Sequence, residues 1–159
     1  MKKILLIIIC NIILQNVGIA QWQQVNYGLY SGEILNFTVD PTTNYVFAGT
    51  SDGVFLSTNN GSNWTPVNYG LGGNSSYYNG IPVASIAISG CNIFAGTWGD
   101  GVYLSTNNGS SWTEVNNGMS GKSKVSSILI SGNNIFAGTN EGVFLTTNNG
   151  FIWTAKIMD

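Results

Sequence analysis

The sequence predicts an all-β chain made of repeated four-stranded units, and three observations carry that prediction. Tryptophans recur at Trp22, Trp64, Trp112 and Trp153, at spacings of 42, 48 and 41 residues. A common sequence pattern precedes the last three tryptophans, as in "NIFAGTWGDGVYLSTNNG" before Trp112. After residue 20, short apolar runs alternate with Gly- and Asn-rich turns, and no run has the helical period. Units of this length with four short strands are typical of β-propeller blades.

The first element is a segment for export. Lys2 and Lys3 precede an apolar run over 4–14, and Gly18-Ile19-Ala20 ends it with small residues. This pattern predicts a secretory signal peptide at residues 1–20; a retained anchor and a lipid-modified Cys10 are the alternatives. The apolar run is shorter than the roughly 20 residues of a membrane-spanning helix. We therefore expect an exported bacterial protein, periplasmic or extracellular, with no membrane contact after cleavage.

Residues 21–159 are predicted to form part of a β-propeller, with blades at about 32–69, 83–116 and 125–157. Each blade begins with an apolar strand such as "VASIAIS", followed by "NIFAGT" and "GVYLST". These segments are rich in the β-branched and aromatic residues that favour strands. A short strand opened by the repeat tryptophan, such as "WTEVN", ends each unit.

The strand count predicts that the array is open. Residues 22–26, "WQQVN", match the last strand of a blade but have no blade before them, which makes thirteen strands. Propellers usually have 4 to 8 blades, so three blades do not close a ring. Two explanations stay open at this point. The chain is a fragment of a longer propeller, or copies associate through their open strand edges.

The phrase "STNNGSNW", which recurs three times, is predicted to make a tight turn, with a ligand site as the alternative. Its Asn-Gly pair tolerates the positive φ that a hairpin demands. Short polar side chains can bond the backbone of the turn, and the tryptophan can cover it. The predicted turn residues are Ser57, Asn59, Gly61, Trp64, Ser105, Asn107, Gly109, Trp112, Thr146, Asn148, Gly150 and Trp153.

On these residues the chain resembles the Asp-box family, also known as the bacterial neuraminidase repeat. Its pattern, Ser-x-Asp-x-Gly-x-x-Trp, occurs in sialidases, xyloglucanase-type glycosidases, sortilin-type receptors and photosystem II assembly factors. The chain departs from it at the acidic position, where Asn59, Asn107 and Asn148 keep an acceptor oxygen but lose the charge. Thr146 also replaces the first Ser. The resemblance implies a propeller over the whole of residues 21–159, and it leaves the function open because enzymes and non-enzymes share the motif.

The residues that enzymes of this family use are partly missing. Sialidase-like members bind the substrate carboxylate with an arginine triad, whereas this chain has no Arg and no His. Glycoside hydrolysis needs two carboxylates at a set separation, and no convincing pair stands out. We therefore predict an exported non-enzymatic propeller module for binding or scaffolding, with a protein or glycan ligand and no assigned catalytic residue. The alternative is part of a secreted glycoside hydrolase of the Asp-box propeller type.

Three acidic residues form the first candidate ligand site. Asp52, Asp100 and Glu141 each lie 12 residues before a repeat tryptophan and directly before a Gly. The family topology implies loops between the second and third strands, on the face opposite the Asn-Gly turns. Because Asp-Gly is also a hairpin signal, a turn role is the alternative.

Aromatic residues form the second candidate site. The spacing of 48 places six or seven extra residues in the segment 70–82, which contains the adjacent Tyr77 and Tyr78. Trp98 stands where the other blades have Ser51 or Asn140. Aromatic faces beside a carboxylate can hold sugar rings. A tolerated surface insertion is the alternative.

Charge and composition exclude several partners from the prediction. The chain has a net charge of −2 and no basic patch, so we expect no nucleic-acid partner. We expect no metal and no cofactor, because His is missing, no Asp-x-Asp run occurs and only Cys91 remains after cleavage. Asn133 replaces Cys91 in the third repeat, so Cys91 is interpreted as a turn residue.

Overall fold

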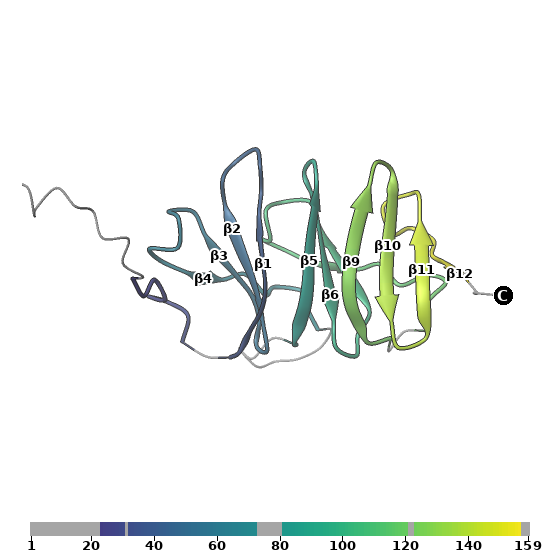
Figure 1. Ribbon diagram of the computed structural model, residues 1–159, viewed down its shortest axis with the longest axis horizontal. Coiled ribbons are helices and arrows are strands. Elements are labelled where there is room, and N and C mark those ends of the chain that lie inside the picture. The colour runs from purple at the N-terminus through teal and green to yellow at the C-terminus, as the bar shows by residue number, and fades with distance from the viewer. Residues whose placement is uncertain (1–22, 31, 73–80, 121–122, 157–159) are drawn as a thin grey trace, which may run out of the picture.

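The computed structural model describes residues 23–30, 32–72, 81–120 and 123–156. In these ranges the chain has twelve β-strands and no helix (Figure 1), and hence no helix that could cross a membrane. The strands form three four-stranded antiparallel sheets. The predicted fold class, an all-β chain of propeller blades, is confirmed.

Each sheet uses its strands in chain order, from an inner first strand to a short outer fourth strand. The first sheet contains β1 (Ile34–Val39), β2 (Val46–Thr50), β3 (Gly53–Ser57) and β4 (Thr65–Pro66). The second contains β5 (Val83–Ser89), β6 (Asn92–Thr97), β7 (Val102–Ser105) and β8 (Thr113–Glu114). The third contains β9 (Val125–Ser131), β10 (Asn134–Thr139), β11 (Gly142–Thr146) and β12 (Thr154–Lys156).

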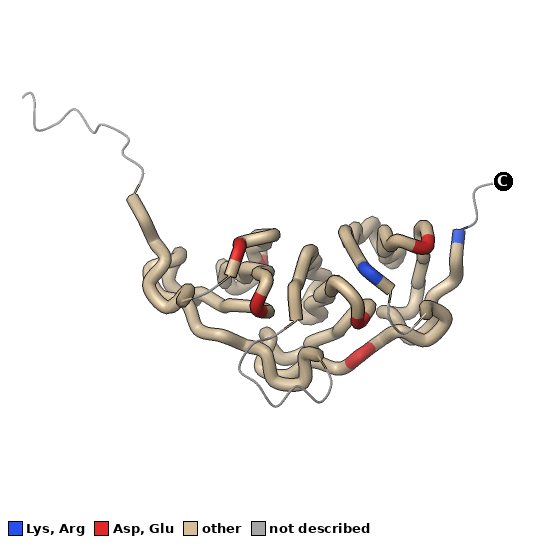
Figure 2. The backbone as a smooth tube through the Cα atoms, turned by 90° about the horizontal axis from the view of Figure 1, so that it is seen from below, with Lys and Arg blue, Asp and Glu red and all other residues tan. Residues whose placement is uncertain are grey.

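The three sheets stand side by side and together form an arc. Figure 2 shows this arc, with the first and third sheets curving toward the same side of the molecule. The inner strands β1, β5 and β9 are neighbours in space. Side chains join them, since Asn36 Oδ1 accepts from the Ile86 amide at 3.1 Å and Ser85 Oγ accepts from the Ile128 amide at 2.9 Å.

The apolar core lies between neighbouring sheets. At the first junction, Phe47 and Val54 of the first sheet pack against a face of the second sheet that includes Tyr103. At the second junction, Phe94 and Val102 pack against the corresponding face of the third sheet. Burying a Phe or Val side chain stabilises a fold by about 1.5–3 kcal/mol. Each blade therefore depends on its neighbours for the burial of its faces.

A β-bulge recurs near the start of the first strand in all three sheets. The register shifts between Ile34 and Asn36 in β1 and between Val83 and Ser85 in β5, and the pairing of β9 with β10 shifts at the same place. Two residues on the bulged strand then oppose one on its partner. As a result Ile34 and Phe37 point to the same face of the first sheet.

The additional strand expected at 22–26 is not formed by the part that the structure describes. Trp22 lies outside the described residues, and residues 23–26 have no strand pairing. A segment becomes a strand only when a neighbouring strand pairs with its backbone. This segment instead bonds a turn, because the Val25 carbonyl accepts from Trp64 Nε1 at 3.0 Å and the Tyr27 carbonyl accepts from the Trp64 amide at 2.8 Å.

Candidate functional site

The turn before β4 is built by the polar side chains of the repeated phrase. Ser57 Oγ accepts from the Gly61 amide at 2.9 Å and donates to Asn59 Oδ1 at 3.0 Å. Asn59 Oδ1 also accepts from the Asn63 amide at 2.9 Å. Asn60 and Gly61 have φ values of 55° and 84°, in the left-handed region that Asn and Gly tolerate. The Ser57 hydroxyl and the side-chain oxygen of Asn59 are therefore engaged within the turn itself.

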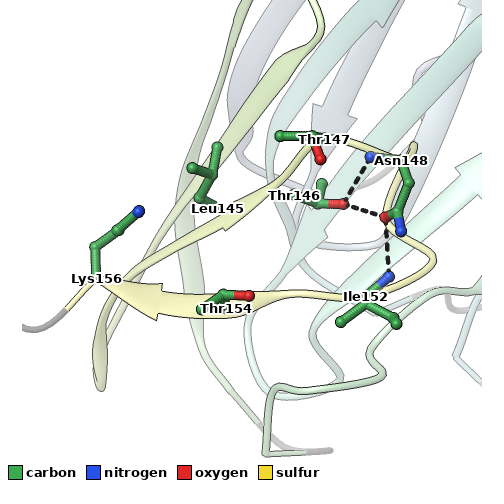
Figure 3. Close-up of a pocket in the computed structure, with 7 residues that line it drawn as sticks. All are labelled: Leu145, Thr146, Thr147, Asn148, Ile152, Thr154 and Lys156. Carbon is green, nitrogen blue, oxygen red and sulfur yellow. Dashed lines mark hydrogen bonds between the residues drawn. The ribbon is translucent and has the colours of Figure 1, made fainter.

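The other two copies of the phrase repeat this arrangement. Ser105 Oγ accepts from the Gly109 amide at 2.9 Å and donates to Asn107 Oδ1 at 2.9 Å. In the third copy Thr146 Oγ1 donates to Asn148 Oδ1 at 2.7 Å (Figure 3). Because Thr carries the same hydroxyl as Ser, the bond persists despite the substitution.

The tryptophan of each turn is buried and fastens its sheet to the segment before it. Their exposed fractions are 7%, 4% and 2% for Trp64, Trp112 and Trp153. Each indole Nε1 donates to a backbone carbonyl 38 to 45 residues earlier, at 2.7 to 3.0 Å. The acceptors are Val25, Val67 and Val115. The phrase thus links successive units as well as turning the chain.

The candidate acidic residues lie at the opposite end of the sheets from these turns. Asp52 precedes β3 and the turn phrase follows it, so the two lie at opposite ends of that strand. The same holds for Asp100 at β7 and Glu141 at β11. β4 runs antiparallel to β3 and ends at this same end, which we call the loop end. Tyr77 and Tyr78 lie outside the described residues.

At Asp52 and Asp100 the backbone takes part in a recurring turn. Asn68 Nδ2 donates to the Asp52 carbonyl at 3.4 Å, and its Oδ1 accepts from the Val54 amide at 2.7 Å. Asn116 Nδ2 donates to the Asp100 carbonyl at 2.9 Å. Both carboxylates are half-buried. The arrangement agrees with the turn role that was the alternative interpretation, and it leaves the carboxylates at the loop end.

Glu141 is held differently, by the chain that leads into the third sheet. Its carboxylate accepts hydrogen bonds from Ser120 Oγ and, at 3.3 Å, from Ser123 Oγ. Ser123 is fully buried, whereas Glu141 is exposed. The carboxylate therefore ties the loop 115–124 to the β10–β11 turn.

Trp98 exposes a large aromatic side chain at the loop end while its backbone is held in place. Its side chain is 46% exposed, and its amide donates to the Pro82 carbonyl at 3.0 Å. A β-bridge joins it to Lys124, whose Nζ lies 4.4 Å from the centroid of the Trp98 ring. Such a cation–π contact is worth about 0.5–1 kcal/mol at an exposed site. Sequence reasoning missed Lys124, because nothing local predicts a contact between two different sheets.

The residues at the corresponding positions bond inward instead. Ser51 Oγ accepts from the Glu33 amide at 3.1 Å, and Asn140 Oδ1 accepts from the Lys124 amide at 2.7 Å. The first and third sheets therefore use this position to hold their own inner strands. Only the second sheet uses it to present an aromatic face.

The titration shifts in the described residues fall at two groups. Hydrogen bonds from the Thr42 amide and the Thr43 hydroxyl hold the pKa of Asp40 below its ordinary value, in the β1–β2 turn. Burial raises the pKa of the Tyr103 phenol, and the charges of Asp100 and Glu114 act in the same direction. Both carboxylates therefore lie near the buried phenol of the second sheet.

No group of three or more potential metal ligands occurs in the part of the chain that the structure describes. A hollow of about 270 Å³ lies instead on the third sheet. Figure 3 shows its lining of residues from β11, the following turn and β12, among them Leu145, Ile152 and Lys156. It is an open depression in the side of the sheet.

No protein-family model and no curated protein matches the chain. Solved structures do match it. An ancestral GH74 enzyme superposes with a TM-score of 0.63 at 25% identity, over 78% of this chain and 18% of that one. The extracellular domain of the BT4673 hybrid two-component system from B. thetaiotaomicron has a TM-score of 0.67 at 16% identity, over 87% and 18%. YCF48 bound to a D1 peptide has a TM-score of 0.63 at 18% identity, over 78% and 40%.

These structures are propellers, and the chain spans less than half the length of each. One of them is an enzyme and another holds a peptide, so the likeness supports the fold and leaves the activity open.

Proposed function

We propose that the chain is a non-catalytic propeller module that binds a protein or carbohydrate ligand at the loop end of its sheets. Trp98 is the observation that carries the proposal. Nearly half of this large aromatic side chain is exposed, although its backbone is held by Pro82 and by the bridge to Lys124. A rigidly mounted aromatic ring with an open face is the kind of group that anchors ligands.

The surroundings of Trp98 support binding of a polar ligand with an apolar face. Lys124 supplies a cation at the ring, and the half-buried Asp100 belongs to the same β6–β7 loop. Ligand sites commonly combine an aromatic surface with a few polar groups that fix orientation. Because Trp98 belongs to the second sheet and Lys124 precedes the third, the site joins two blades.

Several features favour binding over catalysis. The carboxylate of Glu141, one of the three candidate acidic residues, accepts hydrogen bonds from Ser120 and Ser123. The chain also has no His and no Arg. We infer in addition that the protein is exported, to the periplasm or beyond, and that its three blades belong to a larger propeller particle.

A second candidate function is part of a glycoside hydrolase. The observation that favours it is the match to an ancestral GH74 enzyme at 25% identity. The carboxylates of Asp52, Asp100 and Glu141, at corresponding positions of three neighbouring sheets, would then be the groups to test. Under this alternative further catalytic groups would come from other blades.

The test measures binding of the purified protein to a panel of oligosaccharides and peptides. Trp98→Ser gives the second sheet the residue that the first sheet has at this position. We expect it to weaken binding of any oligosaccharide or peptide that binds by about 30-fold, because loss of an aromatic anchor costs about 2 kcal/mol. Phe151→Ser is the matched control, because Phe151 is a 72% exposed aromatic in the third turn phrase, at the opposite end of the sheets. Equal binding by Trp98→Ser and the parent protein would refute the site.

Turnover of the same oligosaccharides distinguishes the two candidate functions. Measurable hydrolysis that Asp100→Asn abolishes, without a loss of folding, would favour the hydrolase. Binding by the parent protein with no hydrolysis by either protein is the result that the binding module predicts.

A further inference from the structure

We propose that the two open faces of the sheet array bind each other, so that two copies of this chain close into a six-bladed ring. The leading face is the side of the first sheet that carries Ile34, Phe37 and Val39. The trailing face is the side of the third sheet that carries Leu129, Phe136, Val143 and Leu145. The proposal does not depend on the ligand that Trp98 binds.

The leading face is exposed only in the first sheet. Ile34, Phe37 and Val39 are 37%, 56% and 53% exposed. The strand registers align Ile34 with Val83 and Phe37 with Ile86. In the second sheet those two residues are 0% and 5% exposed, because the first sheet covers them. These three residues therefore expose part of a blade-to-blade contact surface, whereas Ala48 and Phe55 on the same side of the sheet are buried with Leu29 packed against them.

The trailing face is exposed in the third sheet, whereas the corresponding residues of the first two sheets are buried. Val143 is 40% exposed, whereas the corresponding Val54 and Val102 are fully buried under the next sheet. Phe136 is half-buried, whereas the corresponding Phe47 is fully buried. Leu145 lines the hollow in Figure 3, so that depression belongs to the trailing face.

Polar groups at the two faces also form a matching pair. At the two internal junctions, a side-chain oxygen from one inner strand accepts from the amide of Ile86 or Ile128 in the next. The corresponding oxygen on the trailing face is Ser127 Oγ, and the corresponding amide on the leading face is that of Phe37. Docking of one face on the other would form this bond a third time.

A glycine on the second strand of each sheet leaves space for a neighbouring sheet at the trailing side. A Cβ atom on Gly49 would lie 2.6 Å from the carbonyl oxygen of Val83 in the next sheet, and one on Gly96 would lie 2.7 Å from Val125 Cγ1. Gly138 stands at the same position in the third sheet, where a Cβ would meet only Ser127 of its own sheet. Room for an approaching strand thus exists on a face that no described residue covers.

The segment before the first sheet lies on part of the leading face. At the internal junctions the indole of the turn tryptophan donates to a carbonyl of the preceding unit, that of Val67 or Val115. At the leading face Val25 already provides this carbonyl for Trp64. The third unit has Lys156 of β12 at the same position. Docking with the internal geometry therefore requires β12 or residues 23–26 to leave this position.

The arc favours a second copy as the occupant. Both end sheets curve toward the same side (Figure 2), as in an incomplete ring. Two copies supply six sheets, within the 4 to 8 of known propellers, whereas three copies would exceed it. A leading-to-trailing contact made twice relates the two copies by a two-fold axis, so the association is isologous and closed.

The first measurement is the native mass of the purified exported protein by light scattering. We expect twice the mass of one chain. Phe37→Asp and Val143→Asp each place a charge in one face and should weaken association at least about 100-fold, because a buried unpaired charge is costly. Tyr69→Asp is the control, since Tyr69 is 81% exposed and lies on neither face.

Mixing the two variants tests the direction of docking. Phe37→Asp retains a trailing face and Val143→Asp retains a leading face, so an equal mixture should form a dimer that neither forms alone. A wild-type monomer at all concentrations, or a dimer of Val143→Asp alone, would overturn the proposal, as would an open-ended polymer. Val39→Asp replaces Phe37→Asp if circular dichroism shows that the latter does not fold.

Discussion

At the scale of single residues, the turn phrase works through its oxygen atoms. Asn59 Oδ1 accepts from Ser57 Oγ and from the Asn63 amide, and Asn107 and Asn148 occupy the same position. An amide oxygen and a carboxylate oxygen can both accept these bonds. The geometry therefore accounts for Asn at a position where the family pattern has Asp.

Substitution of Asn59 tests this account. We expect Asn59→Asp to change the free energy of unfolding by less than about 0.5 kcal/mol. Asn59→Ala removes the acceptor and should cost about 1 kcal/mol. Urea unfolding measures both. A larger loss for the Asp variant than for the Ala variant would show that charge, rather than the acceptor, decides the turn.

Asp40 predicts a pH dependence of stability. Because hydrogen bonds from Thr42 and Thr43 lower its pKa in the folded state, its contribution is complete above the unfolded-state pKa and is lost as the pH falls through the folded one. Stability should therefore decline below pH of about 4. Asp40→Asn should flatten that decline in urea titrations between pH 7 and pH 3. An unchanged slope would remove Asp40 as its cause.

At the scale of elements, the second strand of each sheet has two roles. It pairs with its neighbours in the sheet, and its Gly lets the inner strand of the next sheet approach. The glycine on this strand therefore takes part in its own sheet and also determines how closely the next sheet can approach. The segment 23–26 shows that a strand-like sequence is not enough, because without a pairing partner it remains outside any sheet.

Two glycine substitutions test whether the close approach between sheets requires glycine. Gly49→Ala should destabilise the fold by about 1–3 kcal/mol, because its Cβ would meet the backbone oxygen of Val83 at 2.6 Å. Gly138→Ala should cost less in a form that does not associate, since only the Ser127 side chain has to move. Thermal unfolding in the Phe37→Asp background compares them. Equal losses would mean that the close approach between sheets is not what Gly49 protects.

At the scale of the whole molecule, the faces that form the core also remain open at both ends. Phe37 and Val143 are exposed although their counterparts in the second sheet are buried. A repeat array buries the faces of its internal units and leaves those of its end units. Exposed apolar faces of this kind are interaction surfaces or liabilities for aggregation. In the proposed ring both exposed faces are buried, through the same sheet-to-sheet contact that the molecule already makes at its two internal junctions.

Much of the fold could be predicted from the sequence because its signals are local. Alternating apolar residues and Asn-Gly pairs specify strands and turns within a few residues, and their threefold recurrence specifies the blades. The positions of Asp52, Asp100 and Glu141 at one end follow from strand order alone. The contact between Trp98 and Lys124 was not predictable in this way, because the two residues come from different sheets.

The sequence by itself determined the blades, their turns and the position of the tryptophans, since each depends on neighbours along the chain. Only the tertiary structure decided that Lys124 lies over the ring of Trp98, that the Val25 carbonyl bonds Trp64, and that Phe37 and its neighbours on the leading face are exposed. Those features depend on which residues meet across the space between sheets. That meeting is set by packing and curvature, which no short stretch of sequence encodes.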